Sequence, residues 1–83
     1  MKGVDAMRIL KSKQVVKYLA TQDRPTRERI EKALSLLPDG DVVPIVSMVS
    51  TFRLRVGKFR AIFVVEGEII KVTLLDARGQ IYK

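Results

Sequence analysis

The chain has 83 residues and a formal net charge of +7, from 16 Lys and Arg against 9 Asp and Glu, and it contains neither cysteine nor histidine. These absences exclude disulfides, thiolate nucleophiles, Cys/His zinc sites and every mechanism that needs a histidine acid or base. The length fits a single domain over residues 1–83, and the basic excess favours a polyanionic partner, either nucleic acid or an acidic protein, over a charge that serves only solubility.

The sequence contains no sign of a membrane segment. No apolar run approaches the roughly 20 residues that span a bilayer. Residues 1–10 lack the apolar stretch of a signal peptide. We therefore expect a cytoplasmic protein with no membrane partner, and no residue pattern suggests a cofactor or a metal.

The first half of the chain predicts a strand followed by a helix. Met7–Leu10 alternates as a short strand does. Ser12 is a suitable N-cap for a helix that continues to about Gln22. The apolar face of this helix is expected to comprise Val15, Val16 and Leu19.

A second helix follows at once. Asp23 is the expected N-cap, and Pro25 is tolerated in the first turn. Pro38-Asp39-Gly40 ends the helix, so the two helices form a hairpin. The apolar stripe, at spacings of three and four, is Ile30, Ala33, Leu34 and Leu37. The opposite, charged face is expected to be solvated, and it comprises Arg27, Glu28, Arg29, Glu31 and Lys32.

From Val42 onward, β-branched and aromatic residues alternate with turn signals, which is typical of strands. The predicted strands are at about Ile45–Met48, Phe52–Val56, Phe59–Val65 and Ile69–Asp76. A strand, a helical hairpin and an antiparallel meander together form an α+β fold with one sheet.

The most informative segment is the predicted hairpin of residues 52–63. Gly57-Lys58 is a plausible two-residue turn, in which glycine supplies the positive φ. This turn places Arg55 opposite Arg60 and Arg53 opposite Ile62, and paired residues share a face of the sheet. The other face is expected to bury Phe52, Leu54, Val56, Phe59, Ala61 and Phe63.

Three arginines on one face, Arg53, Arg55 and Arg60, have two interpretations. They can extend separately into water, or they can form an anion site, because the planar guanidinium suits phosphate. Arg55 opposite Arg60 is unfavourable by ~0.2–1 kcal/mol, and no acidic residue between Asp41 and Glu66 offsets the repulsion locally. We favour the anion site.

The next hairpin is less regular. A turn at Gly67-Glu68 predicts that Ile70, Val72 and Leu74 join the core face. The arginine-bearing face would then also carry Lys71, Thr73, Ile62, Val64, Ile69 and Leu75. Such a face is basic at one end and apolar at the other, and an exposed apolar patch usually marks a protein partner.

Taken together, these features resemble the RelE/ParE toxin superfamily over nearly the whole chain. The segment Phe52-Arg53-Leu54-Arg55-Val56-Gly57-Lys58-Phe59-Arg60-Ala61-Ile62-Phe63 is similar to the family signature aromatic-Arg-Leu-Arg-Val-Gly-x-aromatic-Arg-x-Ile-aromatic. Arg78-Gly79-Gln80-Ile81-Tyr82-Lys83 is similar to the closing Arg-x-x-Val/Ile-Tyr-basic pattern of the family.

The resemblance implies the toxin of a type II toxin–antitoxin system, with a cognate antitoxin protein as partner. For the RelE branch it implies cleavage of mRNA on the ribosome, in which the ribose 2′-hydroxyl attacks the adjacent phosphate and leaves a cyclic phosphate. Arg53 and Arg55 would hold the substrate, and Arg60 would stabilise the phosphorane. Arg78 would add a phosphate contact, and Tyr82 would stack on a base and assist proton transfer.

Two departures from the family pattern leave other functions open. Residues 42–51 contain no basic side chain, although relatives often carry one there, and Ala77 stands where some relatives have histidine. The main alternative is a ParE-like inhibitor of DNA gyrase without nuclease activity. A further alternative is a non-catalytic basic RNA-binding domain.

Overall fold

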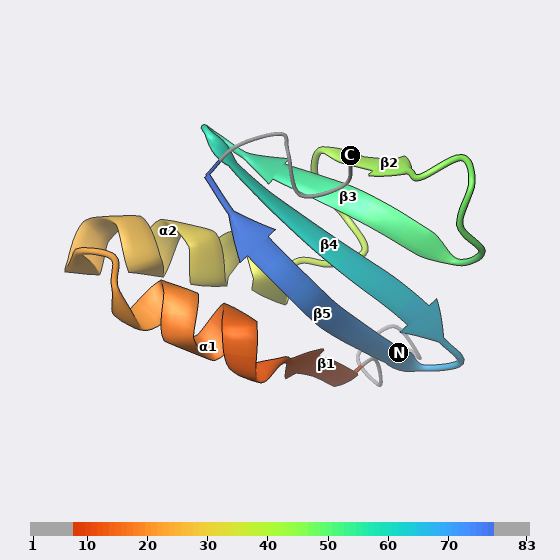
Figure 1. The fold of residues 1–83 in the computed structure, drawn as a ribbon, viewed down its shortest axis with the longest axis horizontal. Coiled ribbons are helices and arrows are strands. Elements are labelled where there is room, and N and C mark those ends of the chain that lie inside the picture. The colour runs from red at the N-terminus through yellow and green to blue at the C-terminus, as the bar shows by residue number, and fades with distance from the viewer. Residues whose placement is uncertain (1–7, 78–83) are drawn as a thin grey trace.

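The computed structural model describes residues 8–77, which form two helices and one sheet (Figure 1). The elements are β1 (Arg8–Lys11), α1 (Lys13–Ala20), α2 (Arg24–Ser35), β2 (Val42–Pro44), β3 (Thr51–Val56), β4 (Phe59–Glu66) and β5 (Ile69–Asp76). Among the described residues, neither helix is both long and apolar enough to cross a membrane.

The sheet has the strand order β1-β5-β4-β3-β2. Strands β2 to β5 form the predicted antiparallel meander, whereas β1 pairs with β5 in parallel. The α+β fold class is therefore confirmed. The sequence prediction did not specify the parallel pairing, which joins the first strand of the described chain, β1, to the last, β5.

Both helices begin where the capping residues predict. The Ser12 Oγ accepts a hydrogen bond from the Val15 N–H at 3.2 Å, and the Asp23 Oδ1 accepts one from the Thr26 N–H at 3.0 Å. The first helix ends at Ala20, earlier than predicted, and Val16 is 54% exposed rather than buried. Val16 is exposed because successive residues of an α-helix are rotated by about 100°, so that when Val15 points toward the sheet Val16 points away from it.

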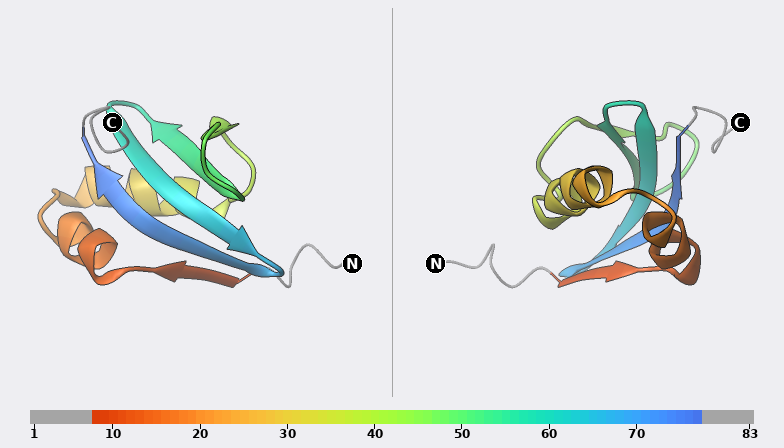
Figure 2. Two further views of the ribbon diagram at one scale, coloured as in Figure 1. Left: turned by 45° about the vertical axis from the view of Figure 1, so that its right-hand side comes forward. Right: turned by 90° about the vertical axis from the view of Figure 1, so that its left-hand side faces the viewer.

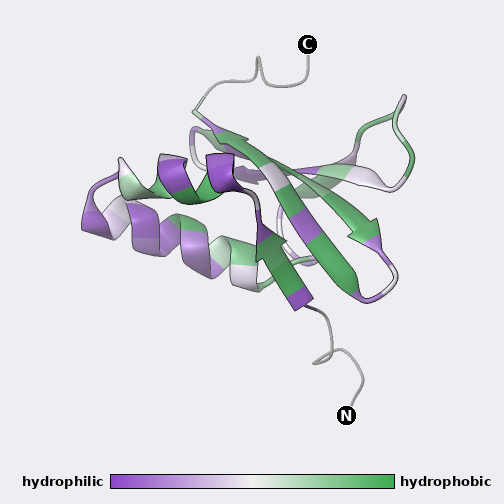
Figure 3. Ribbon diagram, turned by 60° about the horizontal axis from the view of Figure 1, so that its bottom comes forward, coloured by the Kyte–Doolittle hydropathy of each residue, from purple (hydrophilic) through white to green (hydrophobic). Residues whose placement is uncertain are grey.

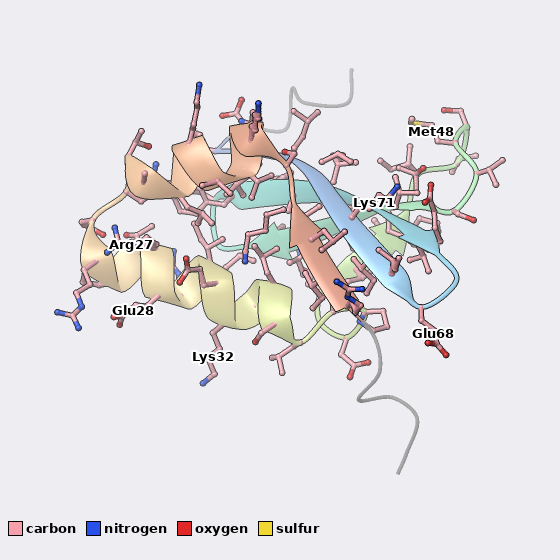
Figure 4. The ribbon with its side chains drawn as sticks, turned by 90° about the horizontal axis from the view of Figure 1, so that it is seen from below. Arg27, Glu28, Lys32, Met48, Glu68 and Lys71 are labelled. Atoms are coloured by element: carbon pink, nitrogen blue, oxygen red, sulfur yellow. The ribbon has the colours of Figure 1, made fainter. Side chains whose placement is uncertain are left out.

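One face of the sheet packs against both helices to form the core (Figure 2). Figure 3 shows hydrophilic and hydrophobic segments alternating along the helices, as expected for amphipathic elements. On α2, the labelled Glu28 and Lys32 side chains project outward (Figure 4), whereas Arg27 is only partly exposed and its Nη1 donates to the Gln22 carbonyl at 3.4 Å. The buried core comprises Val15, Leu19, Ile30, Leu34, Leu37, Leu54, Phe59, Ala61, Phe63, Ile70, Val72 and Leu75.

The predicted strand at Ile45–Met48 is wrong, because the strand before β3 is Val42–Pro44. The chain then turns: the Met48 N–H donates to the Ile45 carbonyl at 3.0 Å, and the Ile45 N–H donates to the Thr51 carbonyl at 2.9 Å. Pro44 suits a strand at the edge of the sheet, since it has no N–H to donate. The apolar run through residue 49 therefore forms an exposed loop rather than a strand.

The predicted faces of β5 hold up to Val72 and then exchange. A β-bulge shifts the register between Ile62 and Phe63, so that Val72 pairs with Phe63 but Leu74 pairs with Ile62. Leu75 is consequently buried at 0% exposure and Leu74 lies on the other face at 37% exposure, the reverse of the prediction. A bulge adds one residue to one strand and so inverts the alternation beyond it.

Candidate anion site

The β3–β4 hairpin has the predicted register. Arg55 pairs with Arg60 and Arg53 pairs with Ile62. Gly57 has a φ of 58°, as the tight turn requires. Because the opposite face of β3 and β4 is packed against the helices, the side chains of Arg53, Arg55 and Arg60 gather on the helix-free face, and we call these three residues the arginine cluster.

The three arginines differ in exposure. The side chain of Arg55 is 50% exposed, whereas that of Arg53 is only 14% exposed. The Nε atoms of Arg53 and Arg60 are buried and have no hydrogen-bond partner within the described part of the chain. A buried donor left without an acceptor costs about 1–3 kcal/mol. An anion with several oxygens, such as phosphate, suits a cluster that presents several guanidinium donors.

Asp41 also belongs to this site, although sequence reasoning missed it. Its Oδ2 lies 2.8 Å from the Arg55 Nε, and its Oδ1 lies 3.9 Å from an Arg53 Nη2. The Arg55 N–H also donates to the Asp41 carbonyl at 3.0 Å. The expectation that no carboxylate offsets the Arg55–Arg60 repulsion locally is therefore wrong. An exposed pair of this kind contributes ~0.2–1 kcal/mol, comparable with the repulsion.

The bulge in β5 brings a second carboxylate to the same face. Asp76 pairs with Arg60 in the sheet register, which the unbulged prediction did not allow. Its Oδ1 accepts a hydrogen bond from the Ala77 N–H at 2.6 Å. Two aspartates therefore flank the arginine cluster: Asp76 at the end of β5, and Asp41 directly before β2.

The remainder of the helix-free face is mixed in character. Lys71 lies opposite Val64, as predicted, and its Nζ forms an ion pair with the Glu66 Oε1 at 2.9 Å. Exposed apolar side chains also occur in the β2–β3 loop, where Val46 is 99% and Val49 is 88% exposed. This apolar loop was predicted as a strand, so its exposure could not be anticipated.

Two predicted site residues, Arg78 and Tyr82, lie outside the described residues. The described chain ends at Ala77, directly after β5 and next to the strand that carries Arg60 (Figure 1). Of the five predicted site residues, the structure thus brings together Arg53, Arg55 and Arg60.

Solved structures share this fold. A chain of the archaeal RelE–RelB complex from Pyrococcus horikoshii OT3 superposes with a TM-score of 0.76 at 26% identity, covering 90% of this chain and 98% of the other. For a chain of the RelB–RelE antitoxin–toxin complex from Methanococcus jannaschii, the TM-score is 0.72 at 26% identity, and the match covers 88% of this chain and 94% of the other. For a chain of the toxin–antitoxin complex RelBE2 from Mycobacterium tuberculosis, the TM-score is 0.70 at 16% identity, and the match covers 88% of this chain and 99% of the other.

These likenesses confirm the fold expected from the arginine signature. The chain has the RelE-like α+β toxin fold over nearly its whole described length. No family model matches the sequence, and no curated protein matches it significantly.

Proposed function

We propose that the chain is the toxin of a type II toxin–antitoxin pair, and that it inhibits translation as a ribosome-dependent mRNA endoribonuclease. The observation that carries the proposal is the arginine cluster on the helix-free face, in which two buried Nε donors lack a partner within residues 8–77. The RelE-like fold supports a toxin role.

The proposed RNA cleavage needs positive charge beside the reacting phosphate, and the arginine cluster supplies it. Attack of a ribose 2′-hydroxyl on the neighbouring phosphate gathers negative charge on the phosphorane, and departure of the 5′-oxygen leaves a cyclic phosphate. Preorganised cations directed at that charge lower the barrier. In the proposal, Arg53 and Arg55 hold the substrate phosphates and Arg60 stabilises the phosphorane, while Arg78 adds a phosphate contact and Tyr82 stacks on a base and assists proton transfer.

The test is cleavage of an mRNA on translating ribosomes, mapped by primer extension. Replacing Arg60 by Ala is expected to slow cleavage about 100-fold, as removal of one preorganised donor does in other enzymes. Arg60→Lys is expected to restore only part of the rate, because lysine keeps the charge but not the planar fork. Arg24→Ala is the matched control, since the Arg24 side chain is 81% exposed on α2 and pairs with Glu28.

Each outcome decides the assignment. Equal cleavage by wild type and a folded Arg60→Ala protein would contradict the proposed role of Arg60. An intact mRNA together with blocked supercoiling by gyrase would move the assignment to the ParE-like alternative. Binding of RNA with neither effect would support a non-catalytic RNA-binding domain.

The proposed protein partner is a cognate antitoxin. An amphipathic helix or extended segment that carries acidic residues would complement both the arginine cluster and the exposed apolar residues of the helix-free face. Leu74, at 37% exposure, and Val43, at 41%, are available on that face. The check is genomic and then biochemical: a small acidic reading frame beside this one, whose product copurifies with the chain and suppresses its toxicity.

A further inference from the structure

We infer that Asp41 is a positioning residue that orients Arg53 and Arg55 for phosphate and limits the affinity of the site for nucleic acid. The inference deepens the proposed function and rests on it. Asp41 precedes the short edge strand β2, and its backbone carbonyl is tied to the Arg55 N–H at 3.0 Å. The carboxylate is therefore anchored beside the arginine cluster by the sheet itself.

The carboxylate divides its oxygens between two arginines. Oδ2 lies 2.8 Å from the Arg55 Nε, and Oδ1 lies 3.9 Å from the Arg53 Nη2. A guanidinium has five N–H donors, so an arginine that uses Nε for Asp41 keeps its Nη donors for a second acceptor. The contact thus fixes the plane of Arg55 without consuming its capacity for phosphate.

The exposure of the group allows a ligand to share the site. The Asp41 side chain is 45% exposed and the Arg55 side chain is 50% exposed. Phosphate can therefore approach the same edge from solvent, where the Asp41 charge opposes it. Orientation and repulsion are thus opposite effects of one side chain, and they are separable by substitution.

Asp76 does not serve in the same way. It pairs with Arg60 in register, but its Oδ1 accepts from the Ala77 N–H, and no ion pair joins it to Arg60 among the described residues. In the described chain, the ion pairs of the cluster all involve Asp41. Asp41 is consequently the carboxylate that orients Arg53 and Arg55, the two arginines with which it pairs.

Asp41→Asn is the informative variant, because the amide oxygen still accepts from Arg55 while the charge is lost. We expect it to bind a single-stranded RNA decamer about threefold more tightly at low salt, since a unit charge within several ångströms of a phosphate is removed. The slope of log affinity against log salt should steepen by up to about 0.7. Asp41→Ala should in addition lower kcat for ribosome-dependent cleavage about tenfold, and Asp41→Glu should restore both readouts toward wild type.

Glu68→Gln is the matched control. It removes the same charge at the exposed β4–β5 turn (Figure 4), at the far end of β4 from Arg60. Arg60 and Glu66, which lies near that turn, are six positions apart along β4, a span of roughly 20 Å. Equal changes in RNA affinity and salt slope for Asp41→Asn and Glu68→Gln would overturn the inference, as would weaker RNA binding by Asp41→Asn.

A second measurement is independent of RNA cleavage. In ¹⁵N NMR spectra of the free protein, the Arg55 Nε–Hε signal should shift and exchange faster in Asp41→Ala but not in Glu68→Gln. An unchanged Arg55 signal would overturn the inference. A wild-type protein that leaves mRNA intact would contradict the proposed function alone, because the NMR and RNA-affinity measurements still decide the role of Asp41.

Discussion

Gln14 on α1 makes a contact whose removal tests how the end of β5 is held. Its Nε2 donates to the Leu75 carbonyl at 2.8 Å, and its Oε1 accepts from the Leu75 N–H at 2.9 Å. The side-chain amide thus continues the pairing that β1 gives β5 as far as Lys11 and Val72. It holds Leu75 beyond the bulge, where the register determines that Asp76 pairs with Arg60.

Replacing Gln14 by Ala removes both hydrogen bonds. Each is worth about 0.5–1.5 kcal/mol net, and an unsatisfied backbone group costs more. Because the Gln14 residue is exposed, water can replace part of the lost pairing, so we expect a loss of about 1–2 kcal/mol in the free energy of unfolding. For a domain of this size that corresponds to a fall in Tm of roughly 5–15 °C.

Urea unfolding followed by circular dichroism measures the loss, and hydrogen exchange at the Leu75 amide locates it. Gln22→Ala is the control, since the Gln22 Nε2 donates to the adjacent Thr21 Oγ1 in an exposed contact and to no other acceptor within residues 8–77. Equal stability of the two variants, or an unchanged exchange rate at Leu75, would refute the argument.

Three further predictions concern the turn, the core and a helix cap. Gly57→Ala should lower the free energy of unfolding by about 1–2 kcal/mol, because φ is +58° and the new Cβ would lie 3.1 Å from the Arg29 Nη2. Gly67→Ala, whose Cβ would have no heavy atom within 4 Å, should lower it less. The reverse order in urea unfolding would contradict this reasoning. Phe63→Ala should lower the free energy of unfolding by about 3–5 kcal/mol in the same assay, since Phe63 is 1% exposed and its ring stacks on that of Phe52 with 5.4 Å between centroids. A loss smaller than that of Gly57→Ala would refute this prediction. The hydrogen bonds from Thr26, and then the charges of Arg27 and Arg29, lower the pKa of Asp23 below 3.8. The Asp23 carboxylate therefore stabilises the fold above pH 3.8, and this stabilisation is lost as the pH falls through the folded pKa. A midpoint at or above 3.8 in an NMR titration of Asp23 would contradict this.

The sequence by itself determined the features that depend on local chemistry. Ser12 and Asp23 cap their helices through a backbone N–H three residues on, so nearby residues suffice to predict them. The β3–β4 register follows from the turn at Gly57 and the two-residue period of a strand. These local rules placed Arg53 and Arg60 on one face before any long-range contact was known.

Only the tertiary structure decided the features that depend on distant partners. Leu74 and Leu75 are equally apolar, and the choice of which is buried depends on the bulge and on Gln14, 61 residues away from Leu75. Val42–Pro44 and Ile45–Met48 both suit a strand, and pairing with β3 selects the first.

The same dependence on pairing explains why Asp41 was missed. Its carboxylate contacts Arg55, 14 residues later in the sequence, because β3 returns antiparallel beside β2. Local periodicity therefore specifies which side chains share a strand face. Long-range pairing specifies which strands, and which opposing charges, lie beside them.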